Sequence, residues 1–458
     1  MNTPFPENIY FVGAGGIGMA ALERFFLSKG SHVAGYDRTP TELTASLESE
    51  GVEIVYDDDP ALIPAGMRDR GSTLVVYTPA VPASHRGLEW FRANGFRVVK
   101  RAEVLGIATA PDRAICFAGT HGKTTTSSMA AHMLHCSPYG CNAFLGGVLR
   151  NYSTNFLLDP KSDLAVVEAD EYDRSFHHLR PWVAVITSTD PDHLDIYGTE
   201  EAYLESFAHF TELIKPGGAL LIHEGLKMRP RTAPGVRVMT YSRTSGDFRC
   251  ENICRADGTL TFDLVTPSGL IPEVKLGVPV EINIDNAIAA MGALWLAGAF
   301  EPDSARAAMA SFMGPKRRFE FWLKEPGRAI IDDYAHHPDE LAASIASVKA
   351  LYPDRKLTVA FQPHLFSRTR DFAPEFAKAL SAADRVVLLP IYPAREEPIE
   401  GVTSQIILDS ITIDDKKLLA DKKYLPEEIK NSNFEILLTV GAGDICNQLP
   451  QIVEAAVD

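Results

Sequence analysis

The sequence predicts an α/β protein with three domains, and three observations lead to this fold class. The chain has 458 residues, which is too many for one hydrophobic core. Two glycine-rich loops each follow an apolar, strand-like run and precede a helical pattern. Apolar runs that alternate with helical patterns continue towards the end of the chain. We therefore expect a Rossmann-like domain at 1–108, a P-loop-type α/β domain with a small antiparallel part at 109–313, and a second Rossmann-like domain at 314–458.

Composition excludes several classes of protein. The formal net charge of −16 argues against nonspecific nucleic-acid binding, which needs a basic surface. No apolar run is long enough to span a bilayer, and the N-terminus lacks the basic and apolar segments of a secretory signal. The six cysteines form no paired C-x-x-C units, which disfavours a disulfide framework and a structural zinc site. We expect a cytoplasmic protein that binds no nucleic acid and no membrane; its oligomeric state stays open.

The first domain opens with a strand, a glycine-rich loop and a helix. The strand is expected at 8–12, and a second strand at 32–37 ends in an acid at the interval that dinucleotide folds use to hold a ribose. Such a loop suits any nucleotide diphosphate, so NAD or FAD is an alternative here. Residues 108–112 are expected to form a linker. The candidate binding residues are Gly13, Gly15, Gly16, Ile17, Gly18 and Asp37.

The second glycine-rich loop gives the strongest chemical signal. An expected strand at 114–118 leads into Gly119-Thr120-His121-Gly122-Lys123-Thr124-Thr125, and a helical pattern follows. This arrangement presents backbone N–H groups, a helix N-terminus and one ammonium to a polyphosphate, and it leaves a hydroxyl for magnesium. The loop is shorter than the common P-loop, and a plain tight turn is the alternative. We interpret it as a nucleotide site.

Acidic side chains follow the next two expected strands. One strand ends at Glu168, with Glu171 shortly after it, and the other is followed by Asp192 and His193. Because parallel strands end at the same edge of a sheet, these groups are expected close to Lys123. Oxygen ligands with one nitrogen donor suit magnesium. For any single acid, helix capping or a solvated charge is the alternative explanation.

Residues 223–275 lack a regular α/β pattern and predict short antiparallel strands, and a helix rich in small residues follows them. Asn283 and Asn286 stand near the start of this helix. Helix capping explains their position, and hydrogen bonding to a nucleotide base is the functional alternative.

The third domain repeats the pattern of strand and polar loop without a lysine phosphate loop. Its polar loops contain Asp333, His336 and His337 after one strand, and His364, Arg368 and Arg370 after another. If residues 368–370 are extended, both arginines point to the same side. A guanidinium fork there would bind a small carboxylate, whereas pairing with Asp371 and Glu375 at the surface is the alternative.

The motifs, in this order, resemble those of the Mur ligases of peptidoglycan synthesis. They comprise the two glycine-rich loops, Glu168-Ala-Asp-Glu, Asp192-His193, Lys316-Arg-Arg-Phe, and the segments 332–338 and 362–371. The resemblance covers essentially the whole chain and implies three domains that bind a UDP-sugar, ATP and an amino acid. The resemblance implies that the first loop binds the diphosphate of a UDP-sugar and not a dinucleotide. Within the family, the motifs are most similar to those of members that join L-alanine to UDP-N-acetylmuramate with ATP and Mg²⁺.

The resemblance also implies roles for individual residues. The ATP-binding set would be Gly119, Thr120, His121, Gly122, Lys123, Thr124, Thr125, Asn283, Asn286, Arg318 and Asp333. Magnesium would be held by Thr124, Glu168 and His193. The acceptor amino acid would contact His337, Arg368 and Arg370. Lys123, His193 and Arg318 would assist phosphoryl transfer, and His336 or His364 would act as the base, because an attacking amine must be neutral.

Two departures from the family pattern leave details open. Ile282 stands where relatives often have histidine, and no lysine occurs between Thr199 and Ile214, where sibling ligases carry a carbamylated lysine. The packing of adenine and the ligands of a second metal are therefore not defined. One alternative is the recycling ligase that attaches the L-Ala-γ-D-Glu-diaminopimelate tripeptide to the same sugar nucleotide. A nicotinamide-dependent oxidoreductase would give Lys123 and Glu168 no function. A regulatory nucleotide-binding module without turnover would not need the acids, lysine and histidines that are present at every expected site position.

Overall fold

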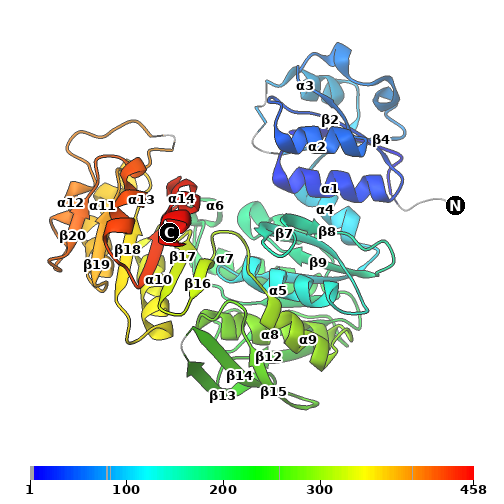
Figure 1. Ribbon diagram of the computed structural model, residues 1–458. Coiled ribbons are helices and arrows are strands. Elements are labelled where there is room, and N and C mark those ends of the chain that lie inside the picture. Colours follow the sequence, from blue (N-terminus) through cyan, green and yellow to red (C-terminus); the bar gives the residue numbers. More distant parts are fainter. Residues whose placement is uncertain (1–4, 79–80, 83, 257, 395, 458) are drawn as a thin grey trace. The chain divides into compact units, whose positions relative to one another are not determined.

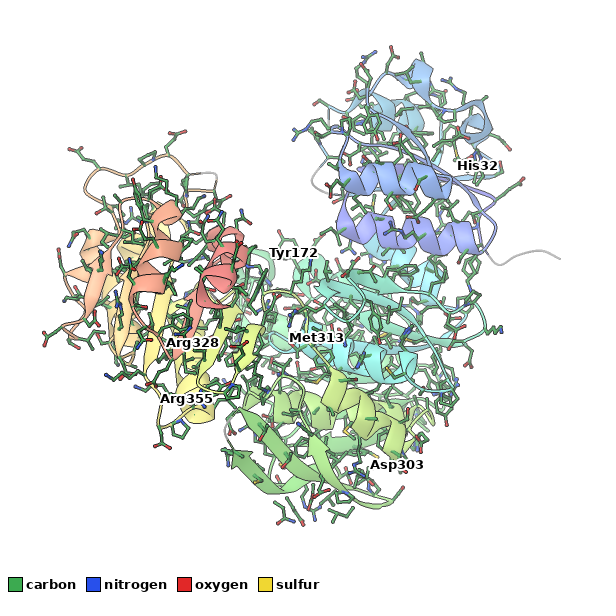
Figure 2. All side chains as sticks on the ribbon, in the orientation of Figure 1. His32, Tyr172, Asp303, Met313, Arg328 and Arg355 are labelled. Carbon is green, nitrogen blue, oxygen red and sulfur yellow. The ribbon has the colours of Figure 1, made fainter. Side chains whose placement is uncertain are left out.

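The computed structural model describes residues 5–78, 81–82, 84–256, 258–394 and 396–457. The chain divides into two compact units of α/β structure (Figure 1). The first comprises Met1–Glu251, Asp263–Pro272 and Asp285–Met309, and the second comprises Asn252–Phe262, Glu273–Ile284 and Ala310–Asp458. Within each unit, side chains fill the layers between the sheets and the helices (Figure 2). The α/β class expected from the sequence is confirmed.

The first sheet is parallel and has the order β3-β2-β1-β4-β5. Its strands are β1 (Asn8–Val12), β2 (His32–Tyr36), β3 (Glu53–Val55), β4 (Thr73–Tyr77) and β5 (Arg97–Lys100). Its helices are α1 (Ile17–Ser28), α2 (Glu42–Glu50), α3 (Arg86–Ala93) and α4 (Arg101–Thr109), with 3₁₀ turns η1 (Pro60–Leu62) and η2 (Ala65–Arg68). Since β1 lies between β2 and β4, the loop after β1 lies where the strand order reverses, which is the ligand position in such sheets.

The prediction of a linker at 108–112 is wrong for residues 108 and 109, which belong to helix α4. Helix α4 continues through Thr109, because Val104 and Ala108 on one face of the helix are fully buried. The Thr109 hydroxyl also donates to the Leu105 carbonyl, 2.8 Å away, so its polar group is satisfied within the helix.

Helix α1 buries a carboxyl group that changes how stability depends on pH. Glu23 is fully buried, and within the described structure neither of its carboxyl oxygens has a hydrogen-bond partner. Burial raises the pKa of Glu23 well above its usual value. With a raised folded-state pKa, the stabilising contribution is complete below the pKa of the unfolded chain and is lost as the pH rises through the folded-state pKa.

We therefore expect Glu23→Gln to raise the Tm more at pH 8 than at pH 5, because the amide removes the titration. Thermal melts at both pH values measure this, with Glu48→Gln on the exposed side of α2 as the matched change of charge. An equal shift at both pH values would contradict a buried titrating carboxyl.

The central sheet has the order β12-β11-β10-β6-β9-β7-β8. Its strands are β6 (Arg113–Ala118), β7 (Asn142–Leu149), β8 (Thr154–Leu157), β9 (Leu164–Glu168), β10 (Val183–Ile186), β11 (Ala219–His223) and β12 (Arg237–Tyr241). The accompanying helical segments are α5 (Lys123–His135), η3 (Tyr172–His178), α6 (Leu194–Tyr197) and α7 (Glu200–Glu212). Strand β8 is antiparallel to β7, and the other neighbouring strands of the described sheet are parallel. Phe117 of β6 pairs with Glu168 on one side and with Val185 on the other, so the ends of β6, β9 and β10 lie together.

A three-stranded sheet follows in the order β13-β14-β15. Its strands are β13 (Arg249–Ala256), β14 (Thr259–Thr266) and β15 (Gly269–Lys275), and helices α8 (Ile282–Leu296) and α9 (Pro302–Ser311) come next. The connections between neighbouring strands are so short that only antiparallel strands can be joined this way. The small antiparallel part expected within 223–275 is therefore confirmed.

The last sheet has the order β16-β17-β21-β18-β19-β20. Its strands are β16 (Glu320–Glu325), β17 (Arg328–Asp333), β18 (Leu357–Phe361), β19 (Arg385–Leu388), β20 (Lys416–Leu418) and β21 (Ile436–Val440). The helical segments are α10 (Pro338–Leu351), α11 (Phe366–Leu380), α12 (Gln405–Leu408), η4 (Lys422–Tyr424), α13 (Leu425–Asn431), η5 (Ile445–Gln448) and α14 (Leu449–Val457). Only the edge strand β16 is antiparallel to its neighbour in the described sheet. No helix within the described ranges combines the length and apolar character needed to cross a bilayer.

Candidate nucleotide and acceptor sites

The loop after β6 has the backbone of a tight phosphate loop. Gly119 and Gly122 have φ values of 140° and 83°, which residues with side chains rarely adopt. A Cβ atom added to Gly119 would lie 2.1 Å from Thr187 Oγ1 and 2.8 Å from the Ser188 nitrogen. The loop therefore packs directly against the end of β10, and only glycine fits at its first position.

Side chains and backbone from the end of β10 hold the loop in place. The His121 N–H donates to Ser188 Oγ at 2.8 Å, and the Thr120 hydroxyl donates to the Asp190 carbonyl at 2.7 Å. Gly122 is the N-cap of α5, so Lys123, Thr124 and Thr125 form its first turn. The first N–H groups of a helix have no intrahelical acceptor, and they favour an anion. This loop has the backbone needed to bind a phosphate chain.

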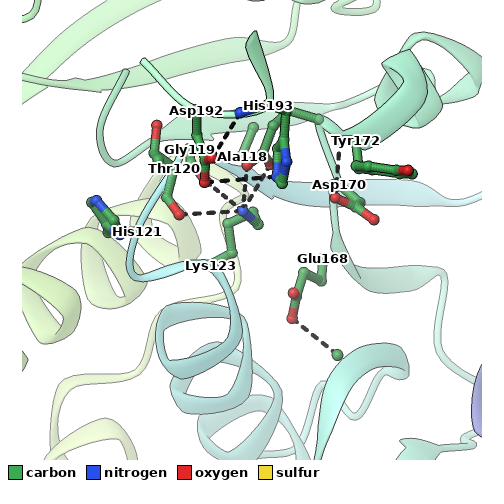
Figure 3. Close-up of polar contacts among 12 residues, drawn as sticks. Ala118, Gly119, Thr120, His121, Lys123, Glu168, Asp170, Tyr172, Asp192 and His193 are labelled. Carbon is green, nitrogen blue, oxygen red and sulfur yellow. Dashed lines mark hydrogen bonds and ion pairs between the residues drawn. The ribbon is translucent and has the colours of Figure 1, made fainter. Parts of the chain in front are cut away.

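A buried acid holds Lys123 at the loop, and Figure 3 shows Lys123 beside Gly119 and Thr120. Lys123 Nζ donates to the Gly119 carbonyl at 2.7 Å and lies 2.8 Å and 2.7 Å from the two carboxylate oxygens of Glu171. The Lys123 side chain is 14% exposed and that of Glu171 is 1% exposed. The ammonium is thus fixed beside the first turn of α5.

The expected magnesium ligands Thr124 and Glu168 are brought together. Thr124 Oγ1 donates to Glu168 Oε1 at 3.0 Å, and the Gly146 N–H donates to Glu168 Oε2 at 2.9 Å. Burial raises the pKa of the Glu168 carboxyl, which means that its charged form needs compensation. A hydroxyl beside a buried carboxylate is an oxygen donor set that fits a hard divalent cation. The two residues therefore fit magnesium.

His193 follows β10 and has a left-handed backbone, with a φ of 52°. Its imidazole lies edge-to-face against Tyr172, with ring centroids 5.2 Å apart, and its Nε2 is 3.7 Å from Asp192 Oδ2. Figure 3 shows the side chains of Tyr172, Asp192 and His193. Across the described ranges, no group of three or more His, Cys, Asp or Glu side chains has the geometry of a metal centre. The metal role of His193 stays a prediction.

The two asparagines expected near the base lie within α8 rather than ahead of it. Asn286 Oδ1 accepts a hydrogen bond from Thr126 Oγ1 at 3.0 Å, and it lies 2.8 Å from a Cβ built on Gly122. Asn286 is therefore beside the phosphate loop. Asn283 is buried and donates through Nδ2 to the Val278 carbonyl at 3.0 Å. Since both residues are helical, capping of α8 does not explain them; their contact with a base stays a prediction.

The loop after β1 has the expected phosphate-binding shape. Gly13 has a φ of 98°, and its N–H donates to the Tyr36 carbonyl at 2.7 Å. Gly16 is the N-cap of α1, and Ile17 in the first turn is 56% exposed. A Cβ on Gly18 would lie 3.1 Å from Arg101 Nη1, so this side of the helix start is crowded.

Asp37 is engaged by the same loop. Its Oδ2 accepts from the Gly15 N–H at 2.7 Å, and its Oδ1 accepts from the Thr39 N–H at 3.1 Å. The carboxylate thus fixes the loop conformation. A contact between Asp37 and a ribose stays a prediction.

In the second unit, Arg318 and Asp333 lie at the start of a polar cluster after β17. Asp333 Oδ1 accepts from the Tyr334 N–H at 3.0 Å and the Phe319 N–H at 3.3 Å, and the Ser344 hydroxyl donates to Oδ2. Burial raises the pKa of Asp333, and the nearby Arg318 guanidinium opposes this rise. Arg318 also lies over the Tyr334 ring, 5.9 Å from its centroid.

The two candidate bases are neighbours in this unit. The rings of His336 and His364 are 6.0 Å apart, and the His364 ring stacks on Tyr392. Burial is the main reason why the pKa of each histidine is lowered. Both are therefore neutral at neutral pH and available to accept a proton. Either histidine remains a candidate.

Residues 368–370 do not have the extended geometry that would place both arginines on one side, because Arg368 and Arg370 lie on α11. Residues two apart on a helix point about 200° apart, so the two guanidinium groups face different sides. Arg368 Nη1 lies 3.5 Å from His364 Nδ1, whereas Arg370 is 54% exposed and pairs with Asp371 at 2.7 Å. His337 is the N-cap of α10 and packs against Phe372. The surface pairing considered as the alternative describes Arg370.

Sequence reasoning assigned no specific role to two carboxylates beside these sites. Glu171 was only one of several acids near a strand end, although its position three residues after Glu168 is the available signal. Glu396 accepts from the Ser367 N–H at 2.9 Å and so caps the start of α11. No local pattern links Glu396 to this helix, since about thirty residues separate them.

Family comparisons agree with this arrangement. Residues 8–113 match the catalytic domain of the Mur ligase family, 117–294 match the Mur ligase middle domain, and 317–443 match the Mur ligase glutamate ligase domain. The chain belongs to the Mur ligase family. All candidate residues named above lie within these three matched ranges.

Individual Mur ligases match along almost the whole chain. The UDP-N-acetylmuramate–L-alanine ligase of Parabacteroides distasonis is 57% identical over 438 residues, covering 95% of this chain and 94% of that protein. The ligase of the same name from Phocaeicola vulgatus is 53% identical over 446 residues, covering 97% of each. The solved UDP-N-acetylmuramate-alanine ligase of Thermotoga maritima is 26% identical with a TM-score of 0.77, covering 98% of this chain and 99% of that one. A murein peptide ligase from Psychrobacter arcticus, 22% identical with a TM-score of 0.61, shares the fold.

Proposed function

We propose that this Mur ligase joins L-alanine to the lactyl carboxylate of UDP-N-acetylmuramate, with cleavage of ATP to ADP and phosphate, in peptidoglycan precursor synthesis. The observation that carries this proposal is identity of 57% and 53% over nearly the full length to two proteins named for that reaction. The recycling tripeptide ligase is favoured by no comparable observation, since the solved murein peptide ligase is only 22% identical. We also propose the domain limits 1–108, 109–313 and 314–458, and action in the cytoplasm.

The chemistry proceeds in two steps. A lactyl carboxylate oxygen attacks the γ-phosphorus of ATP, the bond to the β-phosphate oxygen breaks, and an acyl phosphate and ADP result. The amine of L-alanine then attacks the acyl carbon and displaces phosphate, while a base removes one proton. Phosphoryl transfer requires positioning and neutralisation of charge more than covalent help. Lys123 and Arg318 supply the positive charges, and His336 or His364 supplies the base.

Magnesium would be held by Thr124 and Glu168, whose oxygens meet at 3.0 Å, with His193 as a further ligand. When bound, it would neutralise charge on the phosphate oxygens. We expect Glu168→Gln to raise the magnesium concentration needed for half-maximal rate, because an amide is a poorer ligand for a hard cation. The KM for UDP-N-acetylmuramate should stay near wild type. A magnesium titration of phosphate release measures this, and an unchanged titration would remove Glu168 from the metal site.

The acceptor that the enzyme uses distinguishes an L-alanine ligase from the recycling tripeptide ligase. Phosphate release from ATP with UDP-N-acetylmuramate is measured without amino acid, with L-alanine, and with the L-Ala-γ-D-Glu-diaminopimelate tripeptide. We expect release to depend on L-alanine and the tripeptide to be a poor substrate. Efficient use of the tripeptide with little use of L-alanine would identify the recycling ligase. Consumption of NADH in a parallel sample would identify an oxidoreductase.

Arg368 and Arg370 form a matched pair for testing the acceptor site. Arg368 lies beside His364, and a guanidinium there is suited to bind the carboxylate of L-alanine through two parallel hydrogen bonds. Lysine cannot form this fork. We expect Arg368→Lys to raise the KM for L-alanine about tenfold or more, equivalent to about 1.4 kcal/mol, and to leave the KM for ATP near wild type. Arg370→Lys should behave as wild type, and the reverse order of effects would contradict this assignment.

A further inference from the structure

The ammonium of Lys123 already has three acceptors at short distance. A lysine ammonium carries three N–H donors. One is directed to the Gly119 carbonyl at 2.7 Å, and the two oxygens of Glu171 lie 2.8 Å and 2.7 Å away. The Gly119 carbonyl and Glu171 Oε1 accept hydrogen bonds from the ammonium, whereas Glu171 Oε2 makes an ion contact only. A phosphate oxygen can therefore bind an N–H group of Lys123 while the hydrogen bond to Glu171 Oε1 is retained.

Two hydrogen bonds to the Glu171 carbonyl fix the backbone of this residue. Its carbonyl accepts from the Tyr197 hydroxyl at 2.5 Å and from the Arg174 N–H at 3.0 Å. The following residues Asp173 and Arg174 both have left-handed backbones, with φ values of 51° and 55°. The chain turns sharply after Glu171 and leaves its carboxylate under the loop, where the side chain is 1% exposed. The acid has one defined position relative to Lys123.

A purely stabilising role does not account for this pair. Removing two charges from water costs more than most buried pairs return, so apolar residues would usually serve stability as well. Few ion pairs of the described structure are as buried; Arg317 and Asp332 are 21% and 0% exposed, whereas Lys227 and Glu200 are 75% and 38% exposed. The Lys123–Glu171 pair occurs at the one lysine of the phosphate loop.

We propose that Glu171 is a positioning residue for phosphoryl transfer. It holds the Lys123 ammonium beside the Gly119 carbonyl, and on nucleotide binding the ammonium donates one N–H to a phosphate oxygen while another N–H stays hydrogen-bonded to Glu171. The long lysine side chain then enters the reaction with little rotational freedom left to lose. This inference rests on the proposed ATP-dependent function.

Steady-state kinetics of Glu171→Ala and Glu171→Gln test the proposal. The alanine variant is expected to lower kcat about 100-fold, because a displaced charge loses alignment with the reacting phosphate. The glutamine variant keeps one oxygen acceptor and should lose less. The KM values for UDP-N-acetylmuramate and L-alanine should not change. Glu200→Gln removes the same charge from an exposed pair and should behave as wild type.

A second measurement reports on Lys123 directly. Acetic anhydride labels accessible lysines, and peptide mass spectrometry gives the labelling rate at Lys123. Both Glu171 variants should label faster at Lys123 than wild type and Glu200→Gln do. The labelling measurement needs no acceptor amino acid. If the enzyme ligates an acceptor other than L-alanine, the proposed function fails in the alanine assay, but the labelling difference between the variants and wild type remains. Wild-type kcat in Glu171→Ala, or unchanged labelling, would overturn the proposal, and the isosteric glutamine variant decides if the alanine variant does not fold.

Discussion

Replacing Lys123 with methionine is expected to lower kcat by about 10²–10³-fold, which corresponds to about 3–4 kcal/mol of lost transition-state stabilisation. Lys123 is the charge that the loop after β6 places beside the first turn of α5. Phosphate release under saturating substrates measures the effect. Retention of more than about a tenth of the rate, or less than about 1.4 kcal/mol, would contradict the assigned role.

The same substitution should also destabilise the protein. It leaves the Glu171 carboxylate buried without its cation, and breaking a buried pair costs about 3–5 kcal/mol. The double variant Lys123→Met with Glu171→Gln carries no unpaired charge. We expect it to recover thermal stability but not activity, and this separates loss of chemistry from loss of fold. Recovery of activity in the double variant would show that Lys123 acts through stability alone.

Gly119→Ala is expected to lower kcat/KM for ATP by about 100-fold or more. An alanine side chain would overlap Thr187 Oγ1 and crowd the backbone of Ser188, so the loop must move away from the end of β10. A shift of about 1 Å at such a site costs about 10²-fold in rate. Kinetics with varied ATP measure the loss.

Gly225→Ala is the matched control for this substitution. Gly225 has a φ of 84°, and a Cβ there would meet no atom within 4 Å. It therefore carries the cost of a left-handed alanine, about 1–2 kcal/mol, without a clash. We expect lower stability and wild-type kinetics from this control. Equal kinetic losses in the two variants would mean that backbone strain, not the fit of the loop, explains the Gly119 result.

The central strands could be predicted because their chemistry is local. Strands of a parallel sheet that are buried on both faces read as continuous apolar runs, and 114–118, 164–167 and 183–186 are such runs. Their common direction then brings the polar residues after them to one edge. This argument placed Glu168 close to the loop of Lys123, and the structure has Glu168 hydrogen-bonded to Thr124, the residue after Lys123.

The start of α11 could not be predicted for the opposite reason. The helix begins after Leu365, which has a φ of 71° and offers no capping side chain, and the cap comes from Glu396 in a distant loop. An arginine-rich segment without a local cap has no helix-start signal, so the sequence does not predict that the helix begins there. Which acid pairs with Lys123 could not be predicted either. Which of several acids reaches the ammonium depends on the left-handed turn at Asp173 and Arg174, and sequence periodicity does not encode that turn.

Left-handed backbone at residues with side chains recurs beside the candidate sites. His193, Arg317, Phe319 and Leu365 have φ values between 49° and 71°, and the last three flank Arg318 and His364. Each such residue costs about 1–3 kcal/mol, and surrounding contacts such as the Leu365 N–H bond to the Tyr392 carbonyl hold it in place. Glycine at these positions would relieve the strain and loosen the neighbouring candidate site residues. The enzyme therefore trades thermodynamic stability for precision, and efforts to engineer a more heat-resistant form should leave these four positions unchanged.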